Sequence, residues 1–111
     1  VATADGTGTG TIKQGGFYRV SSTNNDHIVI LPAAVPGTIV YLNSAAETSE
    51  AYELRTTSPS TISINGGSGS NAESAIATGT ALVRCICIDS GKWIATQFAN
   101  DGTESKVEAA A

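Results

Sequence analysis

Apolar and polar residues alternate in short runs along this chain, and the two longest runs are neighbours near its C-terminal end. Residues 80–88 are mostly apolar and β-branched, residues 92–98 form a second run, and Asp89-Ser90-Gly91 separates them. Two such runs joined by a short segment with glycine are typical of a β-hairpin, with a positive φ expected at the glycine. Both alternating faces of 80–88 are largely apolar, so we expect a central strand buried on two sides. Trp93 is expected to cover the end of the core with its indole N–H near water.

Shorter runs with the same alternation lie upstream, and turn residues such as Pro36-Gly37 and Asn65-Gly66 separate them. Glycine and asparagine favour tight turns because they adopt positive φ at low cost. Strands recurring at intervals of roughly 8 to 12 residues predict an all-β fold, a single small antiparallel β-sandwich or barrel. The expected strands are 11–14 and 17–21, or one strand with a glycine bulge, then 27–31, 38–42, 52–57, 61–64 and 74–78, with 44–51 as a loop.

The two ends of the chain differ in composition from the middle. Residues 1–10 are small and polar with alternating glycines, and they carry too little apolar surface to offset the entropy of ordering them alone. We therefore expect an extended N-terminal arm over 1–10, held by another chain; the alternative is an edge strand on its own sheet. Residues 11–100 are expected to form one β domain, and 101–111 a polar C-terminal tail.

Charge and hydropathy argue against two classes of partner. The net charge is −4, and the six lysines and arginines are scattered singly, which leaves no basic footprint for a nucleic acid backbone. No run of 18 apolar residues is present, and the first residues have neither the basic nor the apolar region of a signal peptide, so no membrane partner is expected. A start at Val1 fits a cytosolic product trimmed of its methionine, and equally a processed secretory product.

Cys85 and Cys87 are two residues apart on one expected strand. Their Cα atoms would lie about 6.6 Å apart with parallel Cα–Cβ vectors, whereas an unstrained disulfide needs converging ones. We expect two small buried apolar residues instead. One histidine and these two cysteines fall short of a zinc ligand set, so neither a metal nor another cofactor is expected.

Candidate catalytic groups are few, and the chain is not expected to be an enzyme. His27 is the single histidine and follows an aspartate, but no nucleophile elbow accompanies it, so a capping or edge-strand role is expected. Glu47, Glu50 and Glu53 are expected to form a solvated rim, because nothing apolar encloses them. Residues 66–71 approach a calcium-binding repeat, but the repeat occurs once and has Asn where Asp is needed.

Several residues, most of them at turns and strand ends, match a pattern of small all-β virion proteins of tailed bacteriophages. They are Leu31-Pro32-Ala33-Ala34-Val35-Pro36-Gly37-Thr38, Tyr41-Leu42-Asn43, Ile64-Asn65-Gly66, Ile76-Ala77-Thr78-Gly79, Cys85 and Gly91-Lys92-Trp93. Over residues 31–93 the chain resembles capsid decoration proteins, also called cement or head-stabilising proteins, and it is similar to modules of phage fibres. Pro36 and the loop 44–51 depart from the pattern.

The resemblance implies a non-enzymatic protein, made in the host cytoplasm, that sits on the outer capsid surface of the virion. Such a protein braces neighbouring copies of the major capsid protein, often as a homotrimer, and commonly through an extended terminal arm. In this chain the expected contact residues of the arm are Thr3, Asp5, Thr7, Thr9, Thr11 and Ile12.

Two other functions stay open. A receptor- or carbohydrate-binding module of a phage tail fibre or spike would expose an aromatic platform built from Tyr18, Tyr41, Tyr52 or Trp93, whereas a cement protein would bury most of these. A small secreted hydrolase would need a cleft around His27.

Overall fold

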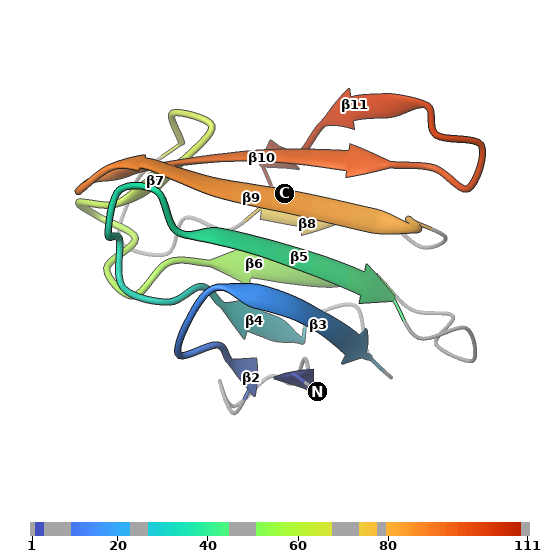
Figure 1. The fold of residues 1–111 in the computed structure, drawn as a ribbon, viewed down its shortest axis with the longest axis horizontal. Helices are drawn as coiled ribbons and strands as arrows, with labels where there is room; N and C mark the ends of the chain where they lie inside the picture. Colours follow the sequence, from blue (N-terminus) through green and yellow to red (C-terminus); the bar gives the residue numbers. More distant parts are fainter. Residues whose placement is uncertain are drawn as a thin grey trace.

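The computed structural model describes residues 2–3, 10–22, 27–44, 51–67, 74–77 and 80–109. In these ranges the chain forms twelve strands and no helix, which confirms the all-β prediction (Figure 1). The strands are β1 (Ala2–Thr3), β2 (Gly10–Thr11), β3 (Gly16–Ser21), β4 (Ile28–Ile30), β5 (Ile39–Ser44), β6 (Tyr52–Arg55), β7 (Ser63–Ile64), β8 (Ser74–Ile76), β9 (Leu82–Asp89), β10 (Lys92–Phe98), β11 (Glu104–Lys106) and β12 (Glu108–Ala109).

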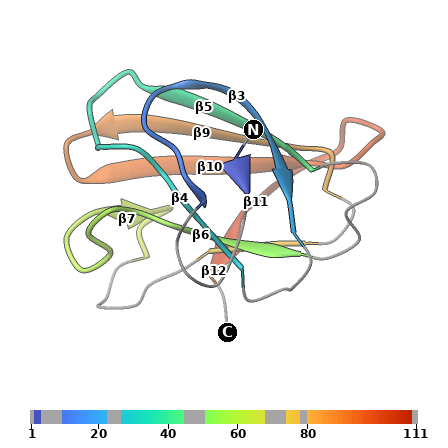
Figure 2. The same ribbon diagram turned by 90° about the horizontal axis from the view of Figure 1, so that it is seen from below.

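The strands lie in two sheets that pack face to face, as the view in Figure 2 shows. The first sheet has the order β1-β3-β5-β9-β10-β11, with β7 beside β10, and the second has the order β12-β8-β6-β4-β2. Neither sheet closes on itself, so the architecture is sandwich-like and not a barrel.

The sheets are mixed, which corrects the prediction of an antiparallel fold. β3 runs parallel to both β1 and β5, and β4 runs parallel to both β2 and β6. The cause is the path of the chain: from β1 to β6, consecutive strands alternate between the two sheets. Neighbours within one sheet are therefore two strands apart in sequence and point the same way. Strand spacing predicts where strands lie but not in which direction neighbours pair.

The predicted hairpin is present as the antiparallel pair β9–β10, with a register shift between Lys92 and Trp93. The Gly91 N–H donates a hydrogen bond of 2.8 Å to the Asp89 carboxylate, which orders the turn. Positive φ occurs at other described glycines but not at Gly91, so that part of the prediction is wrong. A side chain at Gly91 would instead approach the Thr61 carbonyl oxygen at 3.4 Å.

The two predicted turns upstream are confirmed. Gly37 has φ of 90°, and the Thr38 N–H donates to the Val35 carbonyl at 3.1 Å, as in a type II turn. Asn65 and Gly66 have φ of 52° and 82°, the left-handed pair of a type I′ turn.

Both ends of the chain add strands to the sheets. Ala2–Thr3 pairs with β3 and Gly10–Thr11 pairs with β4, so the ends of the expected arm are edge strands of this chain's own sheets, while residues 4–9 lie outside the described residues. The expected polar tail contains β11, paired with β10, and β12, paired with β8. Val107 lies between β11 and β12 in the sequence, and its side chain is buried in the core. This burial fixes the end of the chain to the two sheets.

The core lies between the sheets and includes the side chains that strands β3 to β10 direct inward. Trp93 is completely buried there, and within the described residues its indole N–H has no hydrogen-bond partner. The expectation that this N–H lies near water is therefore wrong. The buried apolar residues are Ile12, Val20, Val29, Leu31, Val40, Leu42, Tyr52, Leu54, Ile64, Ile76, Val83, Cys85, Cys87, Trp93, Ala95 and Val107.

Candidate interaction surfaces

The side of the first sheet that faces away from the core is rich in apolar side chains; we call it the outer face and define it by β3, β5, β9 and β10. Its most exposed large apolar residue is Phe17, with 63% of its surface accessible. Further exposed large apolar side chains on these strands are Ile39, Tyr41, Ile88 and Ile94, and Val35 is exposed in the turn before β5. This finding corrects the prediction that β9 is buried on two sides. Val83, Cys85 and Cys87 face the core, whereas Leu82, Arg84 and Ile86 are only half-buried.

Cross-strand pairing arranges the outer face in rows. Ile39 pairs with Ile86, and Ile86 pairs with Ile94, which forms an aliphatic row across three strands. A second row joins Phe17 to Tyr41, Arg84 and Thr96. Side chains opposite one another on one face of a sheet are in contact range, so these rows form one continuous surface. In the sequence, the apolar residues at both sets of alternating positions in 82–88 indicate that the second face of this strand is apolar as well.

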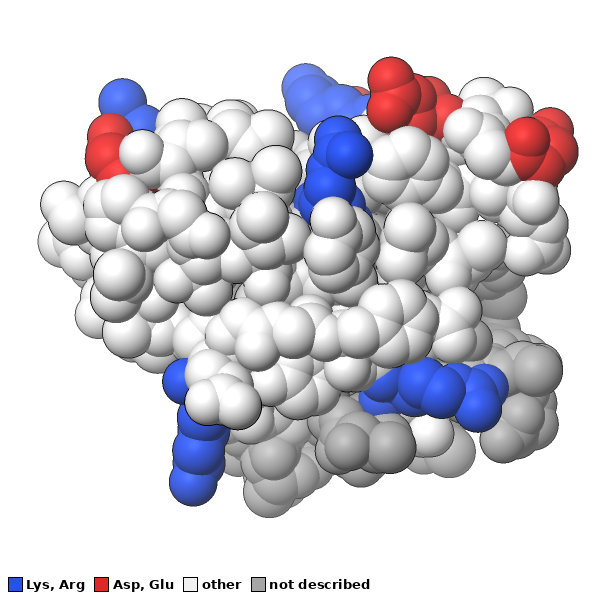
Figure 3. All heavy atoms as spheres, viewed as in Figure 1, with Lys and Arg blue, Asp and Glu red and all other residues white. Residues whose placement is uncertain are grey.

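Figure 3 shows this face with the strands in the orientation of Figure 1. Uncharged atoms cover most of it, basic and acidic side chains both lie along the β10–β11 edge, and basic side chains mark the opposite side of the face, beside β3. Arg84 lies inside the face, with its guanidinium carbon 5.5 Å from the centre of the Phe98 ring, within the range of a cation–π interaction. A contiguous apolar patch with a polar rim is typical of a protein interaction site.

The expected arm residues do not gather in one place that the structure describes. Thr3 lies in β1, the outermost strand of the first sheet, and Thr11 is exposed in β2, the outermost strand of the second. The Ile12 side chain is buried in the core, and its N–H donates to the Ile30 carbonyl at 2.9 Å. Asp5, Thr7 and Thr9 lie outside the described residues. The assignment of these six residues to a partner contact stays a prediction.

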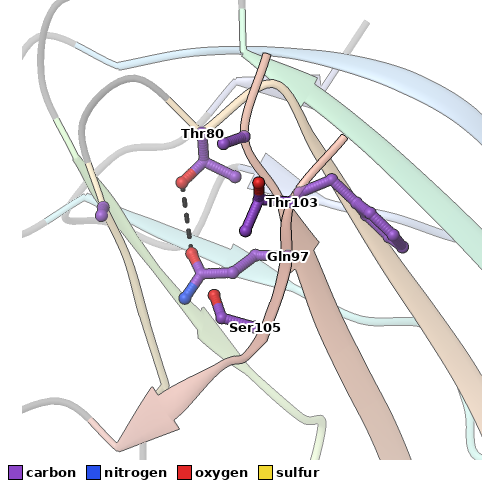
Figure 4. A pocket seen from close by; sticks show the side chains of 7 residues that line it. Thr80, Gln97, Thr103 and Ser105 are labelled. Carbon is purple, nitrogen blue, oxygen red and sulfur yellow. Dashed lines mark hydrogen bonds between the residues drawn. The ribbon is translucent and has the colours of Figure 1, made fainter. Parts of the chain in front are cut away.

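A hollow of about 260 Å³ opens beside the β10–β11 hairpin (Figure 4). Thr80, Gln97, Thr103 and Ser105 direct hydroxyl and amide groups toward it. The Thr80 hydroxyl donates to the Gln97 side-chain oxygen at 3.2 Å, while the Gln97 amide donates to the Lys106 carbonyl at 3.3 Å. None of its lining residues ionises at neutral pH, so it offers neutral hydrogen-bonding groups and no acid–base pair. The residues come from β10, β11 and the segments that precede β9 and β11, which is why no sequence motif marks the hollow.

The candidate catalytic residues are not assembled into a site within the described part of the chain. His27 is half-buried, and its Nδ1 atom is buried there without a hydrogen-bond partner. Glu53 belongs to β6 beside it, with its N–H donating to the His27 carbonyl at 2.9 Å. Glu47, Glu50 and the glycine-rich segment from 68 onward lie outside the described residues.

The described ranges contain no group of three or more His, Cys, Asp or Glu side chains placed to hold a metal ion. They also contain no helix with the length and apolarity required to cross a membrane.

Cys85 and Cys87 are free, buried and on the same face of β9, as predicted. Burial raises the pKa of the Cys85 thiol to about 12 and also raises the pKa of Cys87. The Cys87 Sγ atom lies 3.0 Å from the Asp89 carbonyl oxygen, to which the thiol donates. Both thiols therefore stay protonated in the folded chain at pH values where an exposed thiol ionises.

Alkaline pH is expected to destabilise the fold through these thiols. Above pH 9.0, the ordinary pKa of a thiol, the unfolded chain loses the Cys85 proton, which the folded chain keeps until about pH 12; the raised pKa of Cys87 acts in the same direction. The free energy of unfolding therefore keeps the full contribution of the thiols below pH 9. Above pH 9 it falls, by at most about 1.4 kcal/mol per pH unit for each thiol. Urea unfolding from pH 8 to 11 should show a shallower decline for Cys85→Val than for the unmodified chain. Equal slopes would contradict this account.

The four aromatic residues expected in a glycan-binding platform differ in their exposure. Trp93 and Tyr52 are buried in the core. Tyr18 is half-buried, and its hydroxyl donates to the Gln14 carbonyl at 2.8 Å. Of the four residues expected to form a glycan platform, Tyr41 alone is exposed, beside Phe17.

Comparisons with known protein families, curated proteins and solved structures found no match to this chain.

Proposed function

We propose that this protein is a capsid decoration protein that binds the outside of an icosahedral phage shell and stabilises it by bridging neighbouring copies of the major capsid protein. In this proposal it is a virion structural protein without catalytic activity, made in the host cytoplasm and placed on the outer capsid surface. Support comes from the resemblance over residues 31–93, the acidic net charge of −4, and the burial of Trp93 and Tyr52, two aromatic residues that a glycan-binding platform would expose.

The observation that carries the proposal is the position of β1 and β2, the described parts of residues 1–11, which we call the N-terminal segment. β1 is the last strand of the first sheet and β2 is the last strand of the second, and the two lie close together. Both sheets of the open sandwich therefore end in this segment on the same side. An exposed sheet edge is a template for adding a strand from another chain, where main-chain hydrogen bonds supply affinity.

The pairing of this segment is short. Ala2 and Thr3 pair with two residues of β3, and Gly10 and Thr11 pair with two residues of β4. Because each strand is held by only two residue pairs, its pairing is weak. In the proposal, β1 or β2 leaves its own sheet and pairs with a sheet of a neighbouring chain at a small cost in free energy. In the proposed assembly, three copies associate through their strand edges, and repetition over the shell multiplies weak contacts into avidity.

Removing residues 1–10 is expected to abolish saturable binding to undecorated shells while the domain stays folded, because Ile12 and the rest of the core remain. Co-sedimentation with purified shells measures binding, and Trp93 fluorescence with a thermal melt monitors folding. The exposed substitution Asn100→Ala, in the β10–β11 turn at the opposite edge, is the control and should bind normally. A folded, truncated chain that still saturates shells would overturn the role of the segment.

A receptor- or carbohydrate-binding module of a tail fibre is the second candidate, and the hollow beside Gln97 favours it. Its neutral hydroxyl and amide groups suit an uncharged polyhydroxylated ligand. In the same experiment, a chain that ignores shells but is retained on a glycan surface, with retention lost in Gln97→Ala, would replace the capsid proposal with this one.

A further inference from the structure

We infer that Asn65 is a deamidation site which the fold keeps unreactive, and that its reaction in the unfolded chain makes unfolding irreversible. The inference concerns a covalent modification of the chain, so it does not rest on the proposed function. Asn65 and Gly66 form the single Asn-Gly pair in the sequence, and they occupy the turn that follows β7.

The reaction of an Asn-Gly pair requires only water and base. Base removes the N–H proton of the glycine, whose nitrogen then attacks the side-chain amide carbon of the asparagine. A C–N bond forms, the bond to the amide nitrogen breaks, and this nitrogen takes a proton from water and leaves as ammonia. Water then opens the cyclic succinimide at either carbonyl, which yields aspartate or isoaspartate. Glycine favours ring closure, because it has no side chain to restrict the approach of its nitrogen.

The main chain of the turn opposes this ring closure in the folded protein. Asn65 has φ of 52° and lies in the left-handed region. Its N–H donates to the Trp93 carbonyl at 2.9 Å, and the Gly67 N–H closes the turn on the Ile64 carbonyl at 3.0 Å. The succinimide ring brings the following nitrogen into line with the Cβ atom, a main-chain torsion that a left-handed turn residue does not have. The turn must therefore open before the ring closes.

The Asn65 side chain is restrained as well. Its Oδ1 atom accepts from the Ala95 N–H at 2.9 Å, and its Nδ2 atom donates to the carbonyl oxygens of Ala95 and Val107 at 2.9 and 3.0 Å. Departure of the amide nitrogen as ammonia breaks both of the bonds that Nδ2 donates. Strand β10 and the C-terminal segment thus hold the reacting group together.

Lack of access to water does not explain the protection. Gly66 is exposed, and a side chain built there would meet no atom within 4 Å. Within the described residues, its N–H makes no hydrogen bond. The attacking nitrogen is therefore open to base, so the restraint of the turn and of the Asn65 amide is what slows the reaction.

Neither product fits the place that Asn65 occupies. Aspartate lacks the Nδ2 donor, so the carbonyl oxygens of Ala95 and Val107 would face a carboxylate oxygen. Isoaspartate adds a methylene group to the main chain inside the turn that Ile64 and Gly67 close. Both products weaken the fold, so a modified chain spends more time unfolded. Deamidation therefore removes chains according to the time that they spend unfolded.

Peptide mapping by mass spectrometry tests the inference on the full chain. Trypsin cleaves after Arg55 and Arg84, so Asn65 is recovered in the peptide 56–84, where fragmentation distinguishes it from Asn71. The chain is kept at one mildly alkaline pH and one temperature, with and without guanidinium chloride. The unfolded chain should exchange NH2 for OH at residue 65, and the folded chain should do so at least about a hundredfold more slowly. Gly66→Ala in denaturant is the matched control and should convert severalfold more slowly than the unmodified unfolded chain.

Refolding supplies a second measurement. After dilution from the denaturant, the fraction of chains that regain the native circular dichroism should fall in step with conversion at Asn65. The converted chains should also unfold at a lower denaturant concentration, as Asn65→Asp should. Equal conversion rates in the folded and unfolded chains, no conversion in the unfolded chain, or converted chains that refold with unchanged stability would each overturn the inference.

Discussion

Replacing Asn65 by alanine is expected to lower the free energy of unfolding by about 3 to 5 kcal/mol. The Asn65 side chain accepts a hydrogen bond from the Ala95 N–H at 2.9 Å and donates to the carbonyl oxygens of Ala95 and Val107 at 2.9 and 3.0 Å. It thereby joins the β7 turn to β10 and to the segment that leads into β12. Alanine would remove these hydrogen bonds, although the Ala95 carbonyl would still accept from the Val107 N–H at 3.4 Å. Alanine is also strained at the φ of 52° found here.

Two matched variants separate these causes, with urea unfolding as the measurement. Asn65→Gly removes the strain and all three side-chain hydrogen bonds, so it should be about 1 kcal/mol more stable than the alanine variant. Asn65→Asp keeps the acceptor for the Ala95 N–H but sets a carboxylate oxygen against the carbonyl oxygens of Ala95 and Val107, so at neutral pH it should be less stable than the glycine variant. If Asn65→Ala unfolds at the same urea concentration as the unmodified chain, the side chain does not hold these strands together.

Trp93→Ala is expected to destabilise the domain by about 3 to 5 kcal/mol, because it removes a completely buried large side chain from the core. Trp93→Phe should cost clearly less, since within the described residues the indole N–H makes no hydrogen bond that phenylalanine would lose. Chemical unfolding followed by far-UV circular dichroism, which does not depend on the tryptophan, compares the two. Equal losses for both variants would show that the indole N–H has a partner after all.

Local chemistry explains the parts of the fold that are predictable from sequence. The β9–β10 hairpin follows from two long apolar runs joined by Asp89-Ser90-Gly91, and the turns at Gly37 and Asn65 follow from residues that adopt positive φ. The two cysteines were correctly placed in the core because their spacing puts them on one face of one strand. In each case the information lies within about ten residues of chain.

Non-local features were not predictable in this way. The direction of pairing between β3 and β5 depends on the chain visiting the other sheet between them, which no local pattern records. Val107 is a single apolar residue in a polar segment, so nothing in its neighbourhood announces that it is buried. The second apolar face of β9 was expected to be covered by this chain, because apolar side chains have the same pattern whether their own chain or another molecule covers them.

The candidate surfaces were predictable only in part. The N-terminal segment was identified from its composition, although its ends pair with β3 and β4 of this chain. The row from Phe17 to Thr96 crosses strands from distant parts of the sequence, so it emerges only from the register of the sheet.

The alternation of strands between the two sheets from β1 to β6 also bears on the order in which the molecule folds. No two consecutive strands in this half pair with each other, so none of them forms as an isolated hairpin, and each parallel pair closes a loop that contains a strand of the opposite layer. The β9–β10 hairpin has no such requirement and also offers an edge to β5. We therefore expect the β9–β10 hairpin to form first and the N-terminal strands to add to it. We also expect folding to be slow for a chain of this size, because the entropy of loop closure comes before the contacts that offset it.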